Sequence, residues 1–400
     1  MYKKIAVIGV VLSLMLSGCS MTGLVVRAEY PSSKERPQTV DESILQAVQE
    51  FSLETSTELL GKHSGNTLYS PLSLYYALAM TAEGAAGTTR EEMNTLLGVD
   101  NEENFAQNCG DLYRYLYRNQ DDHVLQIANS LWMQEGVEFR EEYQQQMKDN
   151  FYASLYAVDF GAQQTAEQMG KWVSEQTGGL LEYEYIPDPS RILTLLNTVW
   201  LQDAWQTRFV EAGTQDDTFY HQDGTETQLP FMHLTDEGMV YQGEGWTRAS
   251  LPLRTCGSIV FVLPEEDVSL AELYADANVL AEALYGGTST SAEISWSVPK
   301  IRIESTLELR DYLEEKIPTA FSMEADLSAM LKETSGYISD VRQKAYLEWD
   351  EEGVAAAAYT EISVNESAAR IDAPIPMQLN RPFLFAVMTE DLPVFIGCYT

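Results

Sequence analysis

Apolar residues recur at helical spacing through much of the first half of the chain. Residues 41–60 carry Ile44, Val48, Phe51 and Leu59 behind an acidic start, which predicts an amphipathic helix. Ser70 before Pro71 predicts a second helix start, because serine caps a helix and proline fits its first position. Thr89-Arg90-Glu91-Glu92 has the spacing of a capping box and predicts a third helix that ends at Gly98.

The second half changes to short β-rich apolar runs bounded by Gly, Pro or Asp. Helical spacing returns at residues 270–285 and 307–316. Helices first and strands later, with long connections, predict an α+β fold rather than alternating βαβ units. No repeat or long linker interrupts residues 41–400, so we expect a single domain there. The predicted strands are Leu193–Leu201, Met239–Arg254, Ser258–Leu263, Ile294–Ile303, Tyr346–Trp349 and Phe383–Val387.

The N-terminus has the form of an export signal. Lys3 and Lys4 precede an apolar run over residues 5–16, which is shorter than the roughly 20 residues that a transmembrane helix needs. Leu16-Ser17-Gly18-Cys19 resembles the bacterial lipobox, which implies cleavage before Cys19 and a lipid on that cysteine. We therefore expect a signal peptide over 1–18, a tether over 19–40, and a monomer on the outer face of a bacterial cell. An ordinary secretory peptide and a secreted protein are the alternative.

Composition narrows the function classes. The 400 residues are 45% hydrophobic and 22% charged, as in a folded globular protein. With 25 Lys and Arg against 61 Asp and Glu the net charge is −36, which repels phosphate backbones and excludes nucleic acid as a partner. Loss of Lys3 and Lys4 with the signal leaves −38. We expect Cys109, Cys256 and Cys398 to be buried thiols rather than a disulfide framework.

Catalytic chemistry has no support in the sequence. The four histidines form no metal-ligand pattern, and no nucleophile elbow, P-loop or dinucleotide fingerprint occurs. We expect no catalytic residue, metal or cofactor, and no enzyme activity. Acidic pairs such as Glu265/Glu266 and Glu351/Glu352 are expected to be solvated surface groups.

One segment needs another explanation. After Glu351-Glu352-Gly353 comes Val354-Ala355-Ala356-Ala357-Ala358-Tyr359, and the alternation continues to residue 365. In an extended chain the even-numbered positions from Val354 to Val364 are all small or apolar, and the odd-numbered ones tolerate water. The segment is suited both to an exposed loop and to a central strand.

At this point the chain resembles the serpin family, over nearly all of residues 41–400. Each matching stretch is weak alone, but their order and spacing are specific. The stretches are Asn66–Ser73, Ala77–Met80, Gly84–Thr89, Ala128–Trp132, Trp172–Val173, Gln176–Gly179, Leu196–Trp200, Trp205, Leu263–Pro264, Val298–Lys300, Ala325–Ser328, Lys344–Ala345, Glu351–Gly353 and Asn380–Phe383.

The resemblance implies a metastable fold of three β-sheets and eight or nine helices with an exposed reactive-centre loop. It implies a serine protease inhibitor that acts as a suicide substrate: the protease forms an acyl-enzyme on the loop, and the cleaved loop, about residues 353–367, inserts into the main sheet. The hinge would be Glu351, Glu352, Gly353 and Val354 with Ala355, Ala356, Ala357 and Ala358. Family inhibitors usually carry Thr or Ser at position 354 and a small residue at 359, but Val354 and Tyr359 should be accommodated.

The resemblance also implies a polar cluster of Ser70, Ser73 and Asn197 where the strands part, and places Trp205 near the loop's entry point. Gln343 stands where many relatives have histidine in that cluster. The serines are equally compatible with plain helix caps, and Trp205 with an ordinary core position.

The family's usual count of fourteen residues from Gly353 gives Ser367-Ala368 as the reactive bond. Small residues there suit an elastase-like or subtilisin-like protease. The alternative is Arg370-Ile371, which suits a trypsin-like protease but lies three residues beyond the count. The acidity of the chain favours a cationic protease. A non-inhibitory surface lipoprotein with the same fold remains a second hypothesis.

Overall fold

Two β-sheets and eight α-helices make up the part of the chain that the computed structural model describes, residues 23–62, 65–99, 102–120, 123–332, 336–338, 341–354 and 373–400. The first sheet, the long sheet, has the order β1-β5-β4-β6-β14-β13-β12, with β3 on β4. Its strands are β1 (Leu24–Val26), β3 (Arg118–Gln120), β4 (His123–Gln134), β5 (Ala153–Val158), β6 (Leu193–Ala204), β12 (Ile301–Glu308), β13 (Arg342–Trp349) and β14 (Gly353–Val354).

The second sheet has the order β15-β11-β8-β9-β10-β16-β17-β2, with β7 on β8. The 18-residue strand β8 pairs with β7, β9 and β11 and so links these strands into one hydrogen-bonded sheet. Its strands are β2 (Thr67–Tyr69), β7 (Gln215–Tyr220), β8 (Glu226–Gly243), β9 (Trp246–Pro252), β10 (Ser258–Pro264), β11 (Thr288–Pro299), β15 (Ile375–Gln378), β16 (Phe383–Thr389) and β17 (Leu392–Tyr399).

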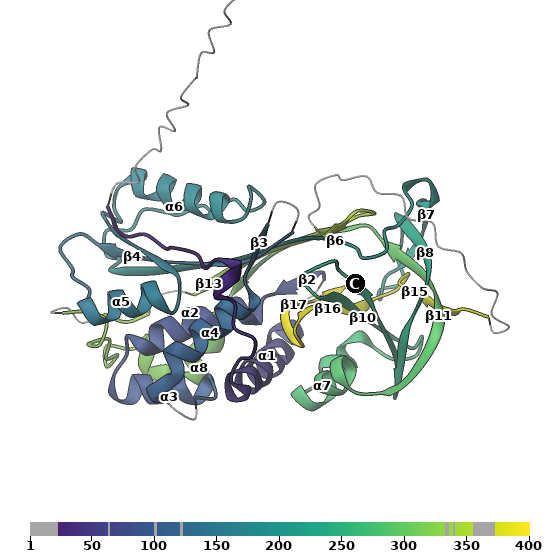
Figure 1. The fold of residues 1–400 in the computed structure, drawn as a ribbon, viewed down its shortest axis with the longest axis horizontal. Coiled ribbons are helices and arrows are strands. Elements are labelled where there is room, and N and C mark those ends of the chain that lie inside the picture. The colour runs from purple at the N-terminus through teal and green to yellow at the C-terminus, as the bar shows by residue number, and fades with distance from the viewer. Residues whose placement is uncertain are drawn as a thin grey trace, which may run out of the picture.

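The helices cover both faces of the long sheet (Figure 1). One face packs on most of the helices and forms the main core, while α6 lies across the other face over Trp132 and Tyr156. The α7 helix covers the second sheet together with α1. The helices are α1 (Glu42–Lys62), α2 (Pro71–Glu83), α3 (Gly87–Leu96), α4 (Phe105–Leu116), α5 (Glu141–Asp149), α6 (Gln163–Gln176), α7 (Ala277–Tyr285) and α8 (Arg310–Lys316).

The α+β prediction is confirmed, with several changes of boundary. Helix α2 begins as expected, since the Ser70 side chain accepts a hydrogen bond from the Ser73 backbone N–H. The capping box at Thr89 is wrong, because α3 begins at Gly87. Thr89 instead accepts a hydrogen bond from Asp326 N–H and Glu92 binds Thr319, so both side chains bind residues far along the chain.

A strand occupies part of the half that we expected to be largely helical, and two predicted strands are each divided in two. The first half contains β4, a twelve-residue strand whose residues are almost all buried. A strand buried on both faces lacks the polar–apolar alternation that reveals a half-exposed one, so its sequence gives no period-2 signal. The predicted strand 239–254 is divided by a turn between β8 and β9, and 294–303 is divided at Lys300 between β11 and β12.

The N-terminal boundary of the domain differs from the expectation. Strand β1 pairs antiparallel with β5 at the edge of the long sheet, and Ala28 N–H donates to Ser154 Oγ at 3.0 Å. The Tyr30 hydroxyl donates to Gln176 Oε1 of α6 at 2.7 Å. Residues 24–26, which we expected to be part of a tether, instead form an edge strand of the long sheet.

The described residues contain neither a membrane-spanning helix nor a metal-binding cluster. Within them, no helix combines the length and apolarity needed to cross a bilayer, and no three His, Cys, Asp or Glu side chains lie together in a way that would hold a metal ion. Cys109, Cys256 and Cys398 are buried free thiols, as expected. Burial raises the pKa of each thiol, so none is poised as a nucleophile.

Candidate functional site

The two-residue strand β14 places Gly353 and Val354 of the predicted hinge inside the long sheet. Val354 pairs with Asp203 of β6 on one side and with Trp349 of β13 on the other, and its side chain is completely buried. Gly353 pairs with Ala204. Gly353 and Val354 thus lie between β6 and β13, antiparallel to both.

Gly353 is needed because the hinge passes very close to β6. A Cβ at this position would lie 2.2 Å from the carbonyl oxygen of Asp203, far inside van der Waals contact. The preceding turn is tight: Asp350 N–H donates to Gly353 O at 3.0 Å, and Asp350 Oδ1 accepts from Glu352 N–H at 2.9 Å. A side chain at position 353 would push this turn away from the sheet.

Glu351 and Glu352 hold the turn through ion pairs. Glu351 Oε2 lies 2.6 Å from Lys300 Nζ, and Glu351 Oε1 accepts a hydrogen bond from the Thr214 hydroxyl at 2.7 Å. Burial opposes ionisation of Glu351, but the bonds from Lys300 and Thr214 outweigh it and lower its pKa. Glu352 pairs with Arg208 Nη1 at 2.6 Å. The expectation of two solvated carboxylates is wrong for Glu351, whose side chain is only 9% exposed.

Trp205 forms the floor of the turn. Its indole N–H donates to Asp350 O at 2.7 Å, and its backbone N–H donates to Glu352 O at 3.0 Å. The side chain is buried and meets the Phe209 ring edge to face. The structure therefore places Trp205 directly under the point where the chain enters the sheet.

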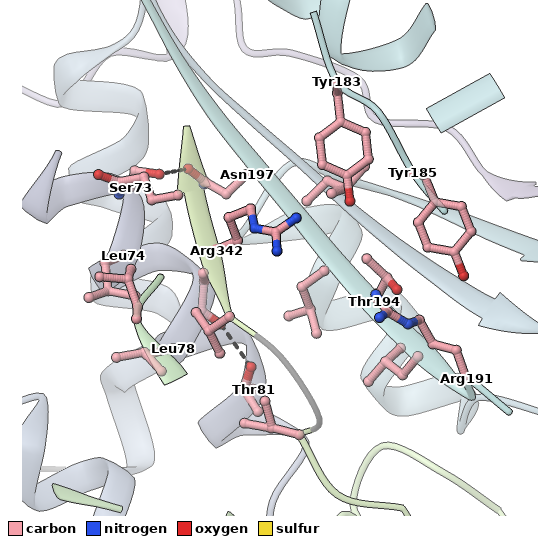
Figure 2. Close-up of a pocket in the computed structure, with 18 of the residues that line it drawn as sticks. Ser73, Leu74, Leu78, Thr81, Tyr183, Tyr185, Arg191, Thr194, Asn197 and Arg342 are labelled. Carbon is pink, nitrogen blue, oxygen red and sulfur yellow. Dashed lines mark hydrogen bonds between the residues drawn. The ribbon is translucent and has the colours of Figure 1, made fainter. Parts of the chain in front are cut away.

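Beyond β14, no strand of the described residues lies between β6 and β13. In the ladder that the described residues form, β6 and β13 each pair with β14 and not with each other. The space between the two strands holds a cavity of about 240 Å³, which Figure 2 shows with Tyr183, Tyr185, Arg191 and Arg342 around it. A second cavity of about 250 Å³ lies beside it, under the α6 side of the sheet. Sequence reasoning gave no sign of either cavity.

A polar cluster lies beneath this opening. Ser70 and Gln343 exchange two hydrogen bonds of 2.8 Å, from Ser70 N–H to the Gln343 side-chain oxygen and from its amide to Ser70 O. The Ser73 hydroxyl donates to the Asn197 side-chain oxygen (Figure 2). The Asn197 amide in turn donates to Asn129 Oδ1 at 2.5 Å.

This cluster joins α2 to both strands that flank the opening, because Asn197 lies on β6 and Gln343 on β13. The structure thus brings together Ser70, Ser73, Asn197 and Gln343, and adds Asn129 of β4, which we did not single out. Asn129 is fully buried and donates to Phe151 O, so a buried polar residue within an apolar strand was the available signal.

Several predicted residues lie outside the described part of the chain. These are Cys19, Ala355, Ala356, Ala357, Ala358, Tyr359, Ser367, Ala368, Arg370 and Ile371.

Comparison with known proteins gives a single answer. A family model described as serpin (serine protease inhibitor) matches residues 46–400. The chain belongs to the serpin family. It is 27% identical over 361 residues to an uncharacterized serpin-like protein of Thermococcus kodakarensis, covering 88% of this chain and 83% of that one. It is also 27% identical over 398 residues to intracellular coagulation inhibitor 2 of Tachypleus tridentatus, covering 95% and 97%.

The serpin architecture is equally clear from solved structures. The chain superposes on the thermophilic serpin tengpin in its native state with a TM-score of 0.82 at 27% identity, covering 94% of this chain and 97% of tengpin. Against tengpin in its latent state the TM-score is 0.76 at 26% identity, covering 90% and 98%. The resemblance and the α+β serpin fold predicted from the sequence are confirmed, and the family is one of protease inhibitors.

Proposed function

We propose that this serpin inhibits a serine protease as a suicide substrate. The protease attacks the reactive-centre loop, and the loop from Val354 onward then enters the long sheet as a full strand between β6 and β13. The protease supplies the nucleophile, while the inhibitor supplies the scissile bond and the energy of the added strand. The observation that carries the proposal is β14, a two-residue strand that lies between β6 and β13, which in the described part of the chain do not pair with each other.

The register of β14 supports our proposal that the even-numbered residues from 354 to 364 are buried in the inserted strand. Extending the pairs Val354–Asp203 and Val354–Trp349 by two residues places Ala356 opposite Leu201 and Leu347, both buried. Extending them by six places Thr360 opposite Asn197 and Gln343. A hydroxyl would then reach the polar cluster, where it has hydrogen-bonding partners.

Tyr359 fits the same register. It would lie opposite Thr198 and Lys344 on the α6 side of the sheet, at the cavity of about 250 Å³ that these two residues line. A cavity of this size has room for a phenol ring, so a large residue at position 359 does not block insertion.

The register also supports Ser367-Ala368 as the reactive bond. Thirteen residues beyond Val354, at about 3.3 Å each, span about 43 Å and bring Ser367 opposite Ser190, just beyond the end of β6 at Leu193. Cleavage at Arg370-Ile371 would leave three residues of slack. We therefore propose an elastase-like or subtilisin-like target, with a trypsin-like target as the alternative. We propose that it is cationic, since the chain carries −36.

The test is to incubate the mature protein with pancreatic elastase, subtilisin and trypsin, and to resolve the products in denaturant. We expect a covalent complex with elastase or subtilisin and a released peptide that begins at Ala368 by mass spectrometry. The association rate should fall as NaCl is raised. Cleaved chain without any covalent complex would contradict the proposal and favour the non-inhibitory surface lipoprotein.

A further inference from the structure

The N-terminus of the folded domain lies at one defined end of the long sheet. Gly23 O accepts a hydrogen bond from Ala157 N–H at 2.7 Å, next to Val158 at the end of β5. Val158 pairs with Gln134, and the adjacent residue Met133 pairs with Leu193. We call this end, formed by Gly23, Val158, Gln134 and Leu193, the foot of the sheet. Figure 1 shows the purple start of the described chain at this end, on the left.

The hinge lies at the opposite end. From Leu193 to Ala204, β6 advances eleven residues, or about 36 Å, to the point where Gly353 pairs. A strand that begins at Val354 and runs antiparallel to β6 ends at the foot. The foot is thus both where the chain emerges from its N-terminal segment and where an inserted loop would finish.

The reach from the proposed lipid to the foot is short. Cys19 precedes Gly23 by four residues, which span at most about 14 Å when fully extended. Because β1 is hydrogen-bonded into the sheet, none of the residues after Gly23 lengthens this connection. A lipid on Cys19 would hold the foot within about 14 Å of the bilayer.

The exposed apolar side chains at the foot are consistent with a surface that faces the bilayer. Three of its apolar side chains are exposed: Val25 by 50%, Ile186 by 83% and Tyr337 by 48%. Ile186 and Tyr337 line the same cavity as Leu193, and Val25 belongs to β1. Glu135 and Asp159 adjoin the same end, so an anionic surface would repel it. The anchor rather than charge brings the foot to the membrane.

We propose that the anchored protein is oriented with the foot of the sheet toward the bilayer, and with the hinge and the reactive-centre loop directed away from it. The inference rests on the proposed lipid on Cys19 and, for its consequence, on the proposed inhibition. After insertion, Ser367 would lie at the foot on the strand that continues β14. That strand is four inter-strand spacings from β1, so Ser367 would lie about 19 Å to the side of the anchor. A captured protease of about 230 residues is roughly 45 Å across, so it would be carried against the lipid surface.

Energy transfer to the bilayer tests the orientation. The full-length lipidated protein is placed in phosphatidylcholine vesicles that carry an acceptor dye on the headgroup. A donor dye is attached either at Ile186→Cys or, as the matched control, at Met239→Cys. Met239 is exposed and belongs to β8, the strand labelled at the right of Figure 1. The three native cysteines of the domain are buried and should not react. We expect transfer at position 186 to exceed that at 239 severalfold. Equal transfer, or more at 239, would overturn the proposal.

A tether variant tests the consequence. Twenty Gly/Ser residues inserted after Ser20 should reduce transfer at 186 and speed covalent complex formation on vesicles at least twofold, with no change for the unanchored chain. An unchanged rate on vesicles would contradict delivery of the protease to the membrane. Absence of lipid on Cys19 by mass spectrometry, or a dimer in which a second copy shields position 186, would overturn the orientation. Inhibition by the unanchored chain is measured separately, so the two proposals fail independently.

Discussion

At the scale of single residues, β14 and the insertion that we propose to start from it depend on two adjacent positions. Gly353 lets the backbone approach Asp203, and Val354 fills a fully enclosed site between β6 and β13. The sequence pattern put Val354 among the small or apolar alternate positions, and its side chain is buried in the structure. The partners of Glu351 and Glu352 were not predictable, because Lys300 and Arg208 are 51 and 144 residues away and only the fold brings them near.

Replacing Val354 by arginine should convert the inhibitor into a substrate. An unpaired charge at this enclosed site costs several kcal/mol, so insertion would slow while attack on the loop proceeds at an unchanged rate. We expect the ratio of covalent complex to cleaved chain to fall at least tenfold. Val210→Arg, at a side chain that is 68% exposed, is the control and should leave the ratio unchanged. An equal ratio for Val354→Arg and the unsubstituted chain would refute insertion at position 354.

At the scale of elements, the site is formed by the start of α2, the strands β6 and β13, and the turn over residues 350–353. The start of α2 brings Ser70 and Ser73 to Gln343 and Asn197, which lie on the strands flanking the opening. The sequence predicted this helix start and eight of the seventeen described strands, because capping serines and β-rich runs are local signals. It missed β4 and the early start of α3, because burial on both faces and distant hydrogen bonds leave no local pattern.

The turn over residues 350–353 should depend on pH through Glu351. Its pKa is lowered in the folded state, so the Lys300–Glu351 pair contributes stability at neutral pH and loses it as pH falls through that lowered value. Lys300→Gln should destabilise the protein by about 1–2 kcal/mol at pH 7, after allowing for the exposure of Lys300 to solvent. The difference from the unsubstituted protein should shrink as pH falls below 4.5, the ordinary pKa of a glutamate carboxyl.

Denaturant unfolding at pH 7 and at pH 3.5 measures this effect. Lys332→Gln is the matched control, because its partner Glu138 is 71% exposed and such surface pairs contribute little. A destabilisation by Lys300→Gln that is the same at both pH values would show that the ion pair does not hold the turn.

At the scale of the whole molecule, the ordered series of family motifs predicted the fold, although no motif alone is specific. These motifs did not predict the edge strand β1 or the cavities between β6 and β13. The edge strand β1 comes from a short apolar run inside a segment rich in polar residues, and only the free edge of β5 gives it a place. The cavities between β6 and β13 depend on the spacing of two strands that are about 150 residues apart in sequence.

We propose that the long sheet gains stability when the reactive-centre loop enters it as a further strand between β6 and β13. The most direct measurement is the melting temperature of the intact protein beside that of the same protein cleaved once in the reactive-centre loop. Two new ladders of backbone hydrogen bonds and the burial of the even-numbered side chains should raise the Tm by at least about 10 °C. An unchanged or lower Tm after cleavage would contradict the account, because the loop would then have no free energy to release by entering the sheet.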